Sequence, residues 1–229
     1  MRGAGCCIND IFDRNYDGKI QRTKNRPLVS KKITIFEAII FVIVQLLIGL
    51  AVVIQFDTDV ILMSFVIIPL VFVYPLFKRF THFPQVILGL VFNWGVLIGH
   101  MSQTDFFNYT VLYLYFAGVL LTIAYDTVYG FQDLEGDKEL GLKSLAIIFE
   151  KKKNFLSLVY FSSFLLFSFF FFYNYTNLKI NILFCLIILY FLTKQFLAFK
   201  NNSKFMVIFK SNSFLGGVIS ILIAIQSYL

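Results

Sequence analysis

Asn9, Asp13 and Asp17 recur at intervals of four residues near the start of the chain. In a helix this spacing places the three side chains within an arc of about 80° and separates neighbours by about 6 Å along the axis. Carboxylates that face one another repel unless a cation lies between them. Hard oxygen ligands favour Mg²⁺, which connects a few carboxylates to the phosphates of a substrate. The spacing therefore predicts a helix face suited to magnesium and phosphate.

A second acidic group lies far along the chain. Asp126, Asp133 and Asp137 are separated by seven and four residues, so on one continuous helix they fall within an arc of about 40°. Acidic residues at membrane depth are costly and usually functional. Solvated loop acids are the alternative, but such acids rarely keep helical register twice. We therefore expect both groups to act together on one side of the membrane.

Cations follow the first acidic group closely. Arg22, Lys24 and Arg26 come within nine residues of Asp17, and arginine can hold phosphate oxygens through two hydrogen bonds. The positive-inside bias of membrane loops would also place these residues here. For each of them, phosphate binding and this charge bias both remain open.

Two other metal chemistries are considered and rejected. The stretch from Asp13 to Ile20 reproduces the opening of an EF-hand calcium loop, but its twelfth position is Lys24 instead of a bidentate Glu. The three cysteines match neither a disulfide framework nor a zinc spacing. Two single histidines, His82 and His100, are expected to pack at interfaces.

The elements that must position these groups are membrane helices. Hydrophobic residues make up 59% of the 229 residues and charged residues only 14%, and the mean hydropathy is +0.79, so a soluble domain is excluded. The net charge of +7 does not indicate nucleic-acid binding, because the basic residues lie in short gaps between apolar runs. Those runs predict seven spans, at 33–56, 60–77, 83–100, 108–130, 154–174, 180–198 and 212–229.

Lysine and arginine alternate between the connections of these spans. They occur in the connections around 17–32, 78–82, 131–153 and 199–211, whereas the gaps near Asp57 and Asp105 have none and the gap before 180 has Lys179 alone. The positive-inside rule therefore places the four basic connections on the cytoplasmic face. We expect one domain, 1–229, since no linker divides the chain.

Three stretches resemble the UbiA family of intramembrane prenyltransferases. They run from Arg2 to Leu28, which contains N-D-x-x-D-x-x-x-D, from Tyr125 to Phe149, and from Tyr74 to Gly95. The third is similar to the members that act on 4-hydroxybenzoate. The resemblance covers essentially the whole chain.

The resemblance implies an all-helical, polytopic transmembrane bundle of nine helices around a central cavity. Seven full spans and a partial N-terminal helix are present here. Position by position, the residues implied to hold Mg²⁺ on a prenyl diphosphate are Asn9, Asp13, Asp17, Asp126, Asp133 and Asp137, with Asp13, Asp133 and Asp137 catalytic. The implied diphosphate contacts are Arg22, Lys24 and Arg26. Tyr129 is expected to line the cavity and Arg79 to bind the carboxylate of an aromatic acid.

The implied activity is Mg²⁺-dependent transfer of a polyprenyl group from polyprenyl diphosphate to a ring carbon of 4-hydroxybenzoate, in ubiquinone biosynthesis. The alternatives are a member of the same family that acts on another aromatic or quinone precursor, and an inactive truncated remnant. The expected location is a bacterial inner membrane or, alternatively, a mitochondrial inner membrane, with the active site facing the cytoplasm.

The chain is also expected to lack its natural beginning. In the resembled family the first acidic motif ends the second transmembrane helix, whereas Met1 to Ile8 here would extend only about 12 Å. We therefore expect coding sequence upstream of Met1 for on the order of 50 to 70 residues, enough for one complete span and the rest of a second.

Overall fold

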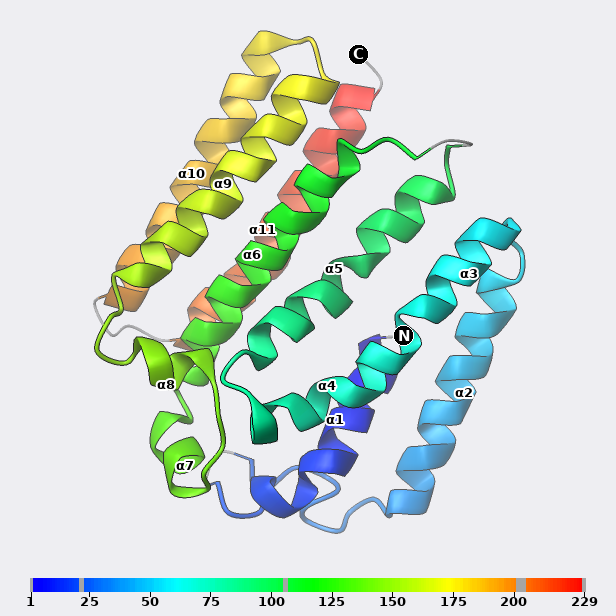
Figure 1. The fold of residues 1–229 in the computed structure, drawn as a ribbon, viewed down its shortest axis with the longest axis vertical. Helices are drawn as coiled ribbons and strands as arrows, with labels where there is room; N and C mark the ends of the chain where they lie inside the picture. The colour runs from blue at the N-terminus through cyan, green and yellow to red at the C-terminus, as the bar shows by residue number, and fades with distance from the viewer. Residues whose placement is uncertain (1, 21–22, 105–106, 201–204, 228–229) are drawn as a thin grey trace.

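The computed structural model describes residues 2–20, 23–104, 107–200 and 205–227, and this part of the chain contains helices and no strand. The helices are α1 (Arg2–Asp17), α2 (Ile35–Val53), α3 (Thr58–Val66), α4 (Ile68–Phe80), α5 (Pro84–Met101), α6 (Val111–Gly130), α7 (Leu134–Glu139), α8 (Leu145–Phe149), α9 (Phe155–Asn174), α10 (Leu178–Lys200) and α11 (Phe205–Ser227). Figure 1 shows them as one bundle, with α7, α8 and the end of α1 together at its lower end. The predicted all-helical fold is confirmed.

Seven segments of the described chain are long and apolar enough to cross a membrane, as the sequence predicts. One of them, Thr58–Phe80, consists of α3 and α4 together. The helix breaks at Ile67, two residues before Pro69, because proline has no N–H to continue the ladder and crowds the preceding turn. The Trp94 indole N–H donates to the Met63 carbonyl at 2.9 Å, so α5 holds the end of α3 in place.

The last span begins earlier than the sequence predicts. The hydropathy pattern places residues 199–211 in a connection, but α11 begins at Phe205. Lys210 interrupts the apolar run without interrupting the helix. The ring of its neighbour Phe209 packs on Tyr125 and Tyr129, with centroids 5.6 and 4.7 Å apart, so tertiary packing stabilises a turn that hydropathy assigns to solvent.

Small residues let α5 and α6 approach closely. Asn93 Nδ2 donates to Thr122 Oγ1 and to the Gly89 carbonyl, both at 2.9 Å. A Cβ on Gly118 would lie 2.2 Å from Asn93 Oδ1. Gly118→Ala is therefore expected to displace Asn93, break both hydrogen bonds and lower stability by about 1–3 kcal/mol. Thermal unfolding in detergent micelles measures the loss.

Gly99→Ala on α5 is the matched control, because no atom lies within 4 Å of the added methyl group. This variant is expected to keep the melting temperature of the parent. Equal melting temperatures for Gly118→Ala and the parent would show that α5 and α6 accommodate the added methyl group without loss of stability.

The topology prediction also has a direct test. Residue 104 follows α5, whereas residues 145 and 205 begin α8 and α11, and the two groups lie at opposite ends of the bundle (Figure 1). Tags at 145 and 205 are expected to report the cytoplasmic side of a bacterial membrane, and a tag at 104 the other side. Finding 104 and 145 on one side would contradict the seven-span topology.

Candidate active site

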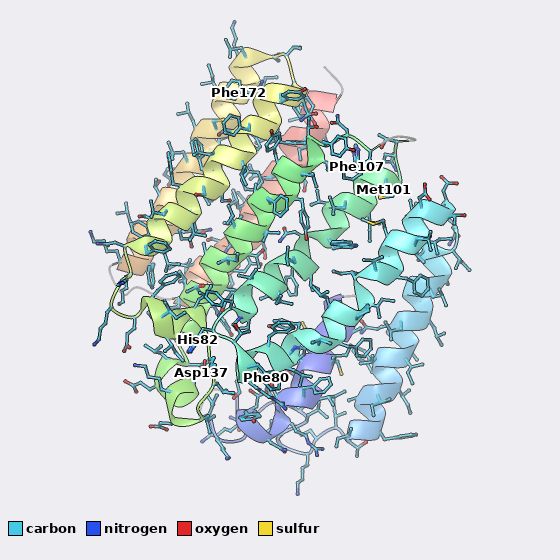
Figure 2. All side chains as sticks on the ribbon, in the orientation of Figure 1. Phe80, His82, Met101, Phe107, Asp137 and Phe172 are labelled. Atoms are coloured by element: carbon cyan, nitrogen blue, oxygen red, sulfur yellow. The ribbon has the colours of Figure 1, made fainter. Side chains whose placement is uncertain are left out.

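A cavity of about 180 Å³ lies between α1, α4 and α6, at the end of the bundle where α7 and α8 pack. Figure 2 shows Asp137 and His82 at this end and Phe172 at the other. The polar residues that line the cavity are Asn9, Asp13, Asp17, Thr23, Arg26, Tyr74, Lys78, Gln85, Asp126, Tyr129, Asp133, Asp137, Lys143 and Ser144. The cavity therefore brings the two acidic motifs together, although more than a hundred residues separate them in the sequence.

The first motif is a single helix face. Because α1 continues without a break to Asp17, Asn9, Asp13 and Asp17 all face the cavity. Asp13 and Asp17 are only 2% and 6% exposed. Asp13 Oδ2 accepts from Lys78 Nζ of α4 at 2.5 Å, whereas its Oδ1 is buried and has no hydrogen-bond partner among the described residues. That oxygen is available to a cation in the cavity.

Arg26 holds the end of α1. Its Nη1 donates to Asp10 Oδ1 at 2.8 Å and to Asp17 Oδ2 at 2.7 Å. The hydroxyl of Thr23 donates to the Asp17 carbonyl at 2.9 Å, so the chain turns back and brings Arg26 over the helix end. One guanidinium thus contacts two carboxylates and lines the cavity.

Burial shapes the protonation of this motif. It raises the pKa of the Asp13 carboxyl above its ordinary value, and the Lys78 ammonium opposes that rise. Burial likewise raises the pKa of Asp10, and Arg26 opposes it. The charged form of these carboxylates therefore depends on the cations beside them.

The second motif is not one continuous helix. The helix α6 ends at Gly130, and Asp133 is the N-cap residue of the separate short helix α7. The N–H groups of Phe131, Gln132 and Asp133 donate to carbonyls three residues earlier, so the chain tightens into a different turn after the glycine. The predicted 40° arc is therefore wrong, although Asp126, Asp133 and Asp137 all line the cavity.

Backbone and side-chain bonds tie the second motif to α4 and α5. The Lys143 amide donates to the Lys78 carbonyl at 2.8 Å, and Lys143 Nζ donates to the Phe80 carbonyl at 3.1 Å. Gln85 Oε1 accepts from the Leu145 amide at 3.2 Å. Between these contacts the buried Ser144 hydroxyl has no hydrogen-bond partner within the described ranges, so it can donate to a ligand in the cavity.

Only some of the predicted substrate contacts line the cavity. Tyr129 and Arg26 line the cavity, but Lys24 is exposed and does not. Arg22 lies outside the described residues. Arg79 does not line the cavity: its Nη2 donates to the Phe12 carbonyl at 2.9 Å, and its guanidinium lies 5.1 Å from the centre of the Tyr16 ring.

Sequence reasoning missed several cavity residues, chiefly Lys78, Tyr74 and Lys143. The sequence assigns Lys78 only to the basic connection around 78–82. Tyr74 and Lys78 are four residues apart, which places them on one helix face, and both line the cavity. That spacing was the available signal, but a tyrosine near a membrane interface is too common to reveal it.

The donor set fits Mg²⁺ that is shared with a phosphate ligand. In the described ranges no three His, Cys, Asp or Glu residues could enclose a metal ion alone. Five aspartates and three basic residues line the cavity, so the acids outnumber the cations by two. An anionic ligand would be repelled unless further cations accompanied it, and the free Asp13 oxygen offers a ligand for one.

The fold and the cavity together define a polytopic helical membrane protein with an acidic site at one end of its bundle. Residues 1–212 match the model of the UbiA prenyltransferase family. The chain belongs to this family.

Relatives with assigned names are similar in sequence over about two thirds of the chain. Identity is 46% over 159 residues with the mitochondrial 4-hydroxybenzoate polyprenyltransferase of Drosophila pseudoobscura pseudoobscura, which covers 69% of this chain and 40% of that protein. It is 40% over 168 residues with the 4-hydroxybenzoate octaprenyltransferase of Haemophilus ducreyi, covering 73% of this chain and 61% of that one. The chain thus matches less than two thirds of the length of these relatives.

Solved structures share the fold. The apo structure of a UbiA homolog from Aeropyrum pernix K1 has a TM-score of 0.76 at 22% identity, covering 96% of this chain and 84% of that one. A UbiA homolog from Archaeoglobus fulgidus, bound to GPP and Mg²⁺, also has a TM-score of 0.76, at 18% identity, covering 98% and 83%. These similarities concern the arrangement of the helices.

Proposed function

We propose that the protein transfers a polyprenyl group from a polyprenyl diphosphate to 4-hydroxybenzoate, in a reaction that requires Mg²⁺ and serves ubiquinone biosynthesis. The observation that carries the proposal is the convergence of both acidic motifs, with Lys78 and Arg26, on one cavity at the end of a membrane bundle. The names of the relatives support the acceptor, and the Archaeoglobus homolog bound to GPP and Mg²⁺ supports the donor and the metal.

The residues that would hold Mg²⁺ are Asn9, Asp13, Asp17, Asp126, Asp133 and Asp137. With Mg²⁺ bound, the charge of the diphosphate is neutralised and it becomes a better leaving group. Lys78, Arg26 and Ser144 line the cavity and would donate to diphosphate oxygens. These donors stabilise the negative charge that develops when the bond from carbon 1 of the prenyl group to oxygen breaks.

The acceptor completes the reaction. A ring carbon ortho to the phenol forms the new bond to carbon 1 of the prenyl group, and the proton that this ring carbon loses passes to a base. Tyr74 and Tyr129 line the cavity, and their rings can shield the allylic cation from water and stabilise it with their π faces. The apolar prenyl chain would extend toward the hydrocarbon region between the helices.

The same cavity suits other acceptors of the family. A prenyltransferase that acts on another aromatic or quinone precursor would use the same carboxylates and differ in its acceptor contacts. The similarity to enzymes named for 4-hydroxybenzoate, in animals and bacteria alike, favours that acid. We place the protein in a bacterial or mitochondrial inner membrane, with the cavity on the side of the basic connections.

Product analysis tests the proposal. Membranes that contain the chain are incubated with Mg²⁺, a polyprenyl diphosphate and 4-hydroxybenzoate, and the products are identified by mass spectrometry. We expect a ring-prenylated hydroxybenzoate that is absent when Mg²⁺ is chelated. Prenylation of a different aromatic acid in a competition mixture would assign the alternative acceptor, and no product from any acceptor would favour an inactive protein.

Arg79 is predicted to recognise the carboxylate of the acid. Its Nε is buried and has no hydrogen-bond partner in the described part of the chain, so the guanidinium keeps a donor beyond its bond to Phe12. Arg79→Ala is expected to raise the KM for 4-hydroxybenzoate about tenfold or more and to change the KM for the prenyl diphosphate far less. Steady-state kinetics with each substrate varied in turn measure both values.

The contacts of Arg79 with Phe12 and Tyr16 supply the competing explanation. If the residue only positions α1, then both KM values should change equally, because the helix carries the first acidic motif. Lys19→Ala is the control for loss of a cation at this end of the bundle, since Lys19 is exposed and does not line the cavity.

A further inference from the structure

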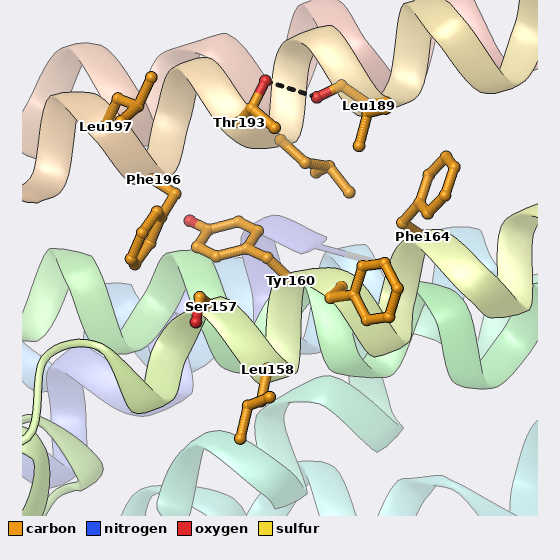
Figure 3. A pocket seen from close by; sticks show the side chains of 10 residues that line it. Ser157, Leu158, Tyr160, Phe164, Leu189, Thr193, Phe196 and Leu197 are labelled. Carbon is orange, nitrogen blue, oxygen red and sulfur yellow. Dashed lines mark hydrogen bonds between the residues drawn. The ribbon is translucent and has the colours of Figure 1, made fainter.

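A second cavity lies outside the candidate active site, between α9 and α10. It has a volume of about 430 Å³. The side chains that line it are Ser157, Leu158, Tyr160, Phe161 and Phe164 of α9 and Leu189, Leu192, Thr193, Phe196 and Leu197 of α10. Figure 3 shows Tyr160, Phe164 and Phe196 in the space between the two helices. We call this cavity the α9–α10 groove.

The groove opens to the lipid side of the bundle. Leu158, Phe161 and Leu197 at its rim are 56%, 54% and 56% exposed, and both helices are membrane spans. Toward the far ends of the two helices the contact is closed, because the rings of Phe171 and Phe184 lie against each other. The groove is therefore an elongated apolar depression in the half of the bundle that contains the candidate active site, with a shape and composition suited to a hydrocarbon chain.

One polar group on the inner wall has no partner. The Ser157 hydroxyl donates to the Asn154 carbonyl at 2.6 Å, and the Thr193 hydroxyl donates to the Leu189 carbonyl at 2.7 Å (Figure 3). Tyr160, in contrast, is only 3% exposed, and its buried hydroxyl has no hydrogen-bond partner in the part of the chain that the structure describes. A buried hydroxyl without an acceptor is destabilising. A ligand that brought an acceptor to the Tyr160 hydroxyl would remove this cost.

The depth of Tyr160 indicates what kind of acceptor would reach it. Tyr160 follows the first residue of α9 by five positions, about 7.5 Å along the axis. A helical side chain leans toward the N-terminus of its helix, so the hydroxyl lies close to the end of the span, and Figure 3 shows it on the side of Phe196. In a bilayer this level is the boundary between the hydrocarbon core and the headgroups, where the ester carbonyls of phospholipids lie.

Exposed lysines stand just before the start of α9 and at the end of α10, the two helix ends nearest to Ser157 and Leu197. Lys200 is exposed and follows Phe196 by four residues on α10, so both residues lie on one face of that helix. Lys151 and Lys152, also exposed, precede α9. Basic residues at a membrane interface attract anionic headgroups. The order along the groove is therefore cation, hydroxyl donor and then apolar walls.

We propose that the α9–α10 groove binds one acyl chain of an anionic phospholipid. The phosphate of the lipid lies against Lys200 and its neighbours, an ester carbonyl accepts from the Tyr160 hydroxyl, and the acyl chain lies between Phe164 and Leu189. The ring of Phe196, with its centre 6.4 Å from that of Tyr160, borders the ester group of the lipid. This site is separate from the carboxylate cavity and does not depend on the proposed activity.

Native mass spectrometry of the full chain tests the proposal, with phosphatidylglycerol and phosphatidylcholine of identical acyl chains as probes. Thr193→Trp fills the groove from an exposed position and is expected to remove one tightly bound phosphatidylglycerol. Leu183→Trp is its control, because Leu183 is exposed on the same helix outside the groove. Tyr160→Phe is expected to weaken binding about threefold to tenfold.

The charge contribution has its own pair of variants. Lys200→Gln is expected to weaken binding of phosphatidylglycerol about fivefold and to leave phosphatidylcholine unchanged. Lys179→Gln, an exposed lysine at the opposite end of α10, should change neither.

Three results would overturn the proposal. Equal binding of phosphatidylglycerol and phosphatidylcholine by the parent chain would show that the site does not recognise an anionic headgroup. Unchanged binding in Thr193→Trp would place the lipid elsewhere. Displacement of phosphatidylglycerol by an equimolar isoprenoid alcohol, with no competition from other anionic phospholipids, would make the groove a site for the prenyl chain instead.

Discussion

Asp13→Asn and Asp133→Asn are each expected to lower the rate of prenyl transfer by about a hundredfold to a thousandfold or more. The amide keeps the shape of the carboxylate but removes its charge, so the cavity loses a ligand for the cation that must accompany the diphosphate. The two residues belong to different motifs, one in α1 and the other at the start of α7, and both line the cavity. Initial rates at saturating Mg²⁺, with the amount of inserted protein held equal, measure the effect.

The control is Asp59→Asn, which makes the same chemical change at an exposed position in the first turn of α3. It is expected to keep the parent rate. The two cavity variants should still insert into membranes and migrate as the parent does in size-exclusion chromatography, since neither substitution changes the apolar spans. Substantial activity in both variants at saturating Mg²⁺ would contradict the assignment of these carboxylates to metal binding.

The sequence predicts the spans well because a bilayer imposes a narrow range of lengths on apolar helices. Six of the seven predicted spans begin and end within a few residues of the observed helices. The exception is α11, where Lys210 falls inside the helix. Its start depends on the stacking of Phe209 against α6, which hydropathy does not contain.

The two acidic motifs show why local spacing predicts one site better than the other. The spacing of Asn9, Asp13 and Asp17 is enough to predict that they share one helix face, because α1 is continuous to Asp17. The same rule fails between Asp126 and Asp133, since α6 ends at Gly130. The sequence has no proline there from which this helix end could be predicted. Both sets nevertheless reach the cavity, because tertiary contacts position α7.

Partners across long sequence separations are beyond any spacing rule. Lys78 and Asp13 are 65 residues apart, and nothing local distinguishes Lys78 from a lysine that only obeys the positive-inside rule. The Tyr160 hydroxyl is similar: its lack of a partner is a property of the packed helices α9 and α10 and is invisible in a run of apolar residues.

Lys78 gives the second large effect. Lys78→Met is expected to lower kcat/KM for the prenyl diphosphate about a hundredfold, because the cavity loses the cation nearest to Asp13 and a donor to the diphosphate. The same change leaves the carboxylate of Asp13, which is 2% exposed, without its only hydrogen-bonded partner among the described residues. That loss is expected to destabilise the fold by about 1–3 kcal/mol, measured by thermal unfolding in micelles.

A double variant separates the two consequences. In Lys78→Met with Asp13→Asn, neither position of the pair carries a charge, so the melting temperature should recover toward that of the parent. The rate of prenyl transfer should stay as low as in the single variants, because neither the cation nor the carboxylate returns. Recovery of activity together with stability would mean that Lys78 and Asp13 only brace α1 against α4. Recovery of stability alone would place the pair in the binding of the diphosphate.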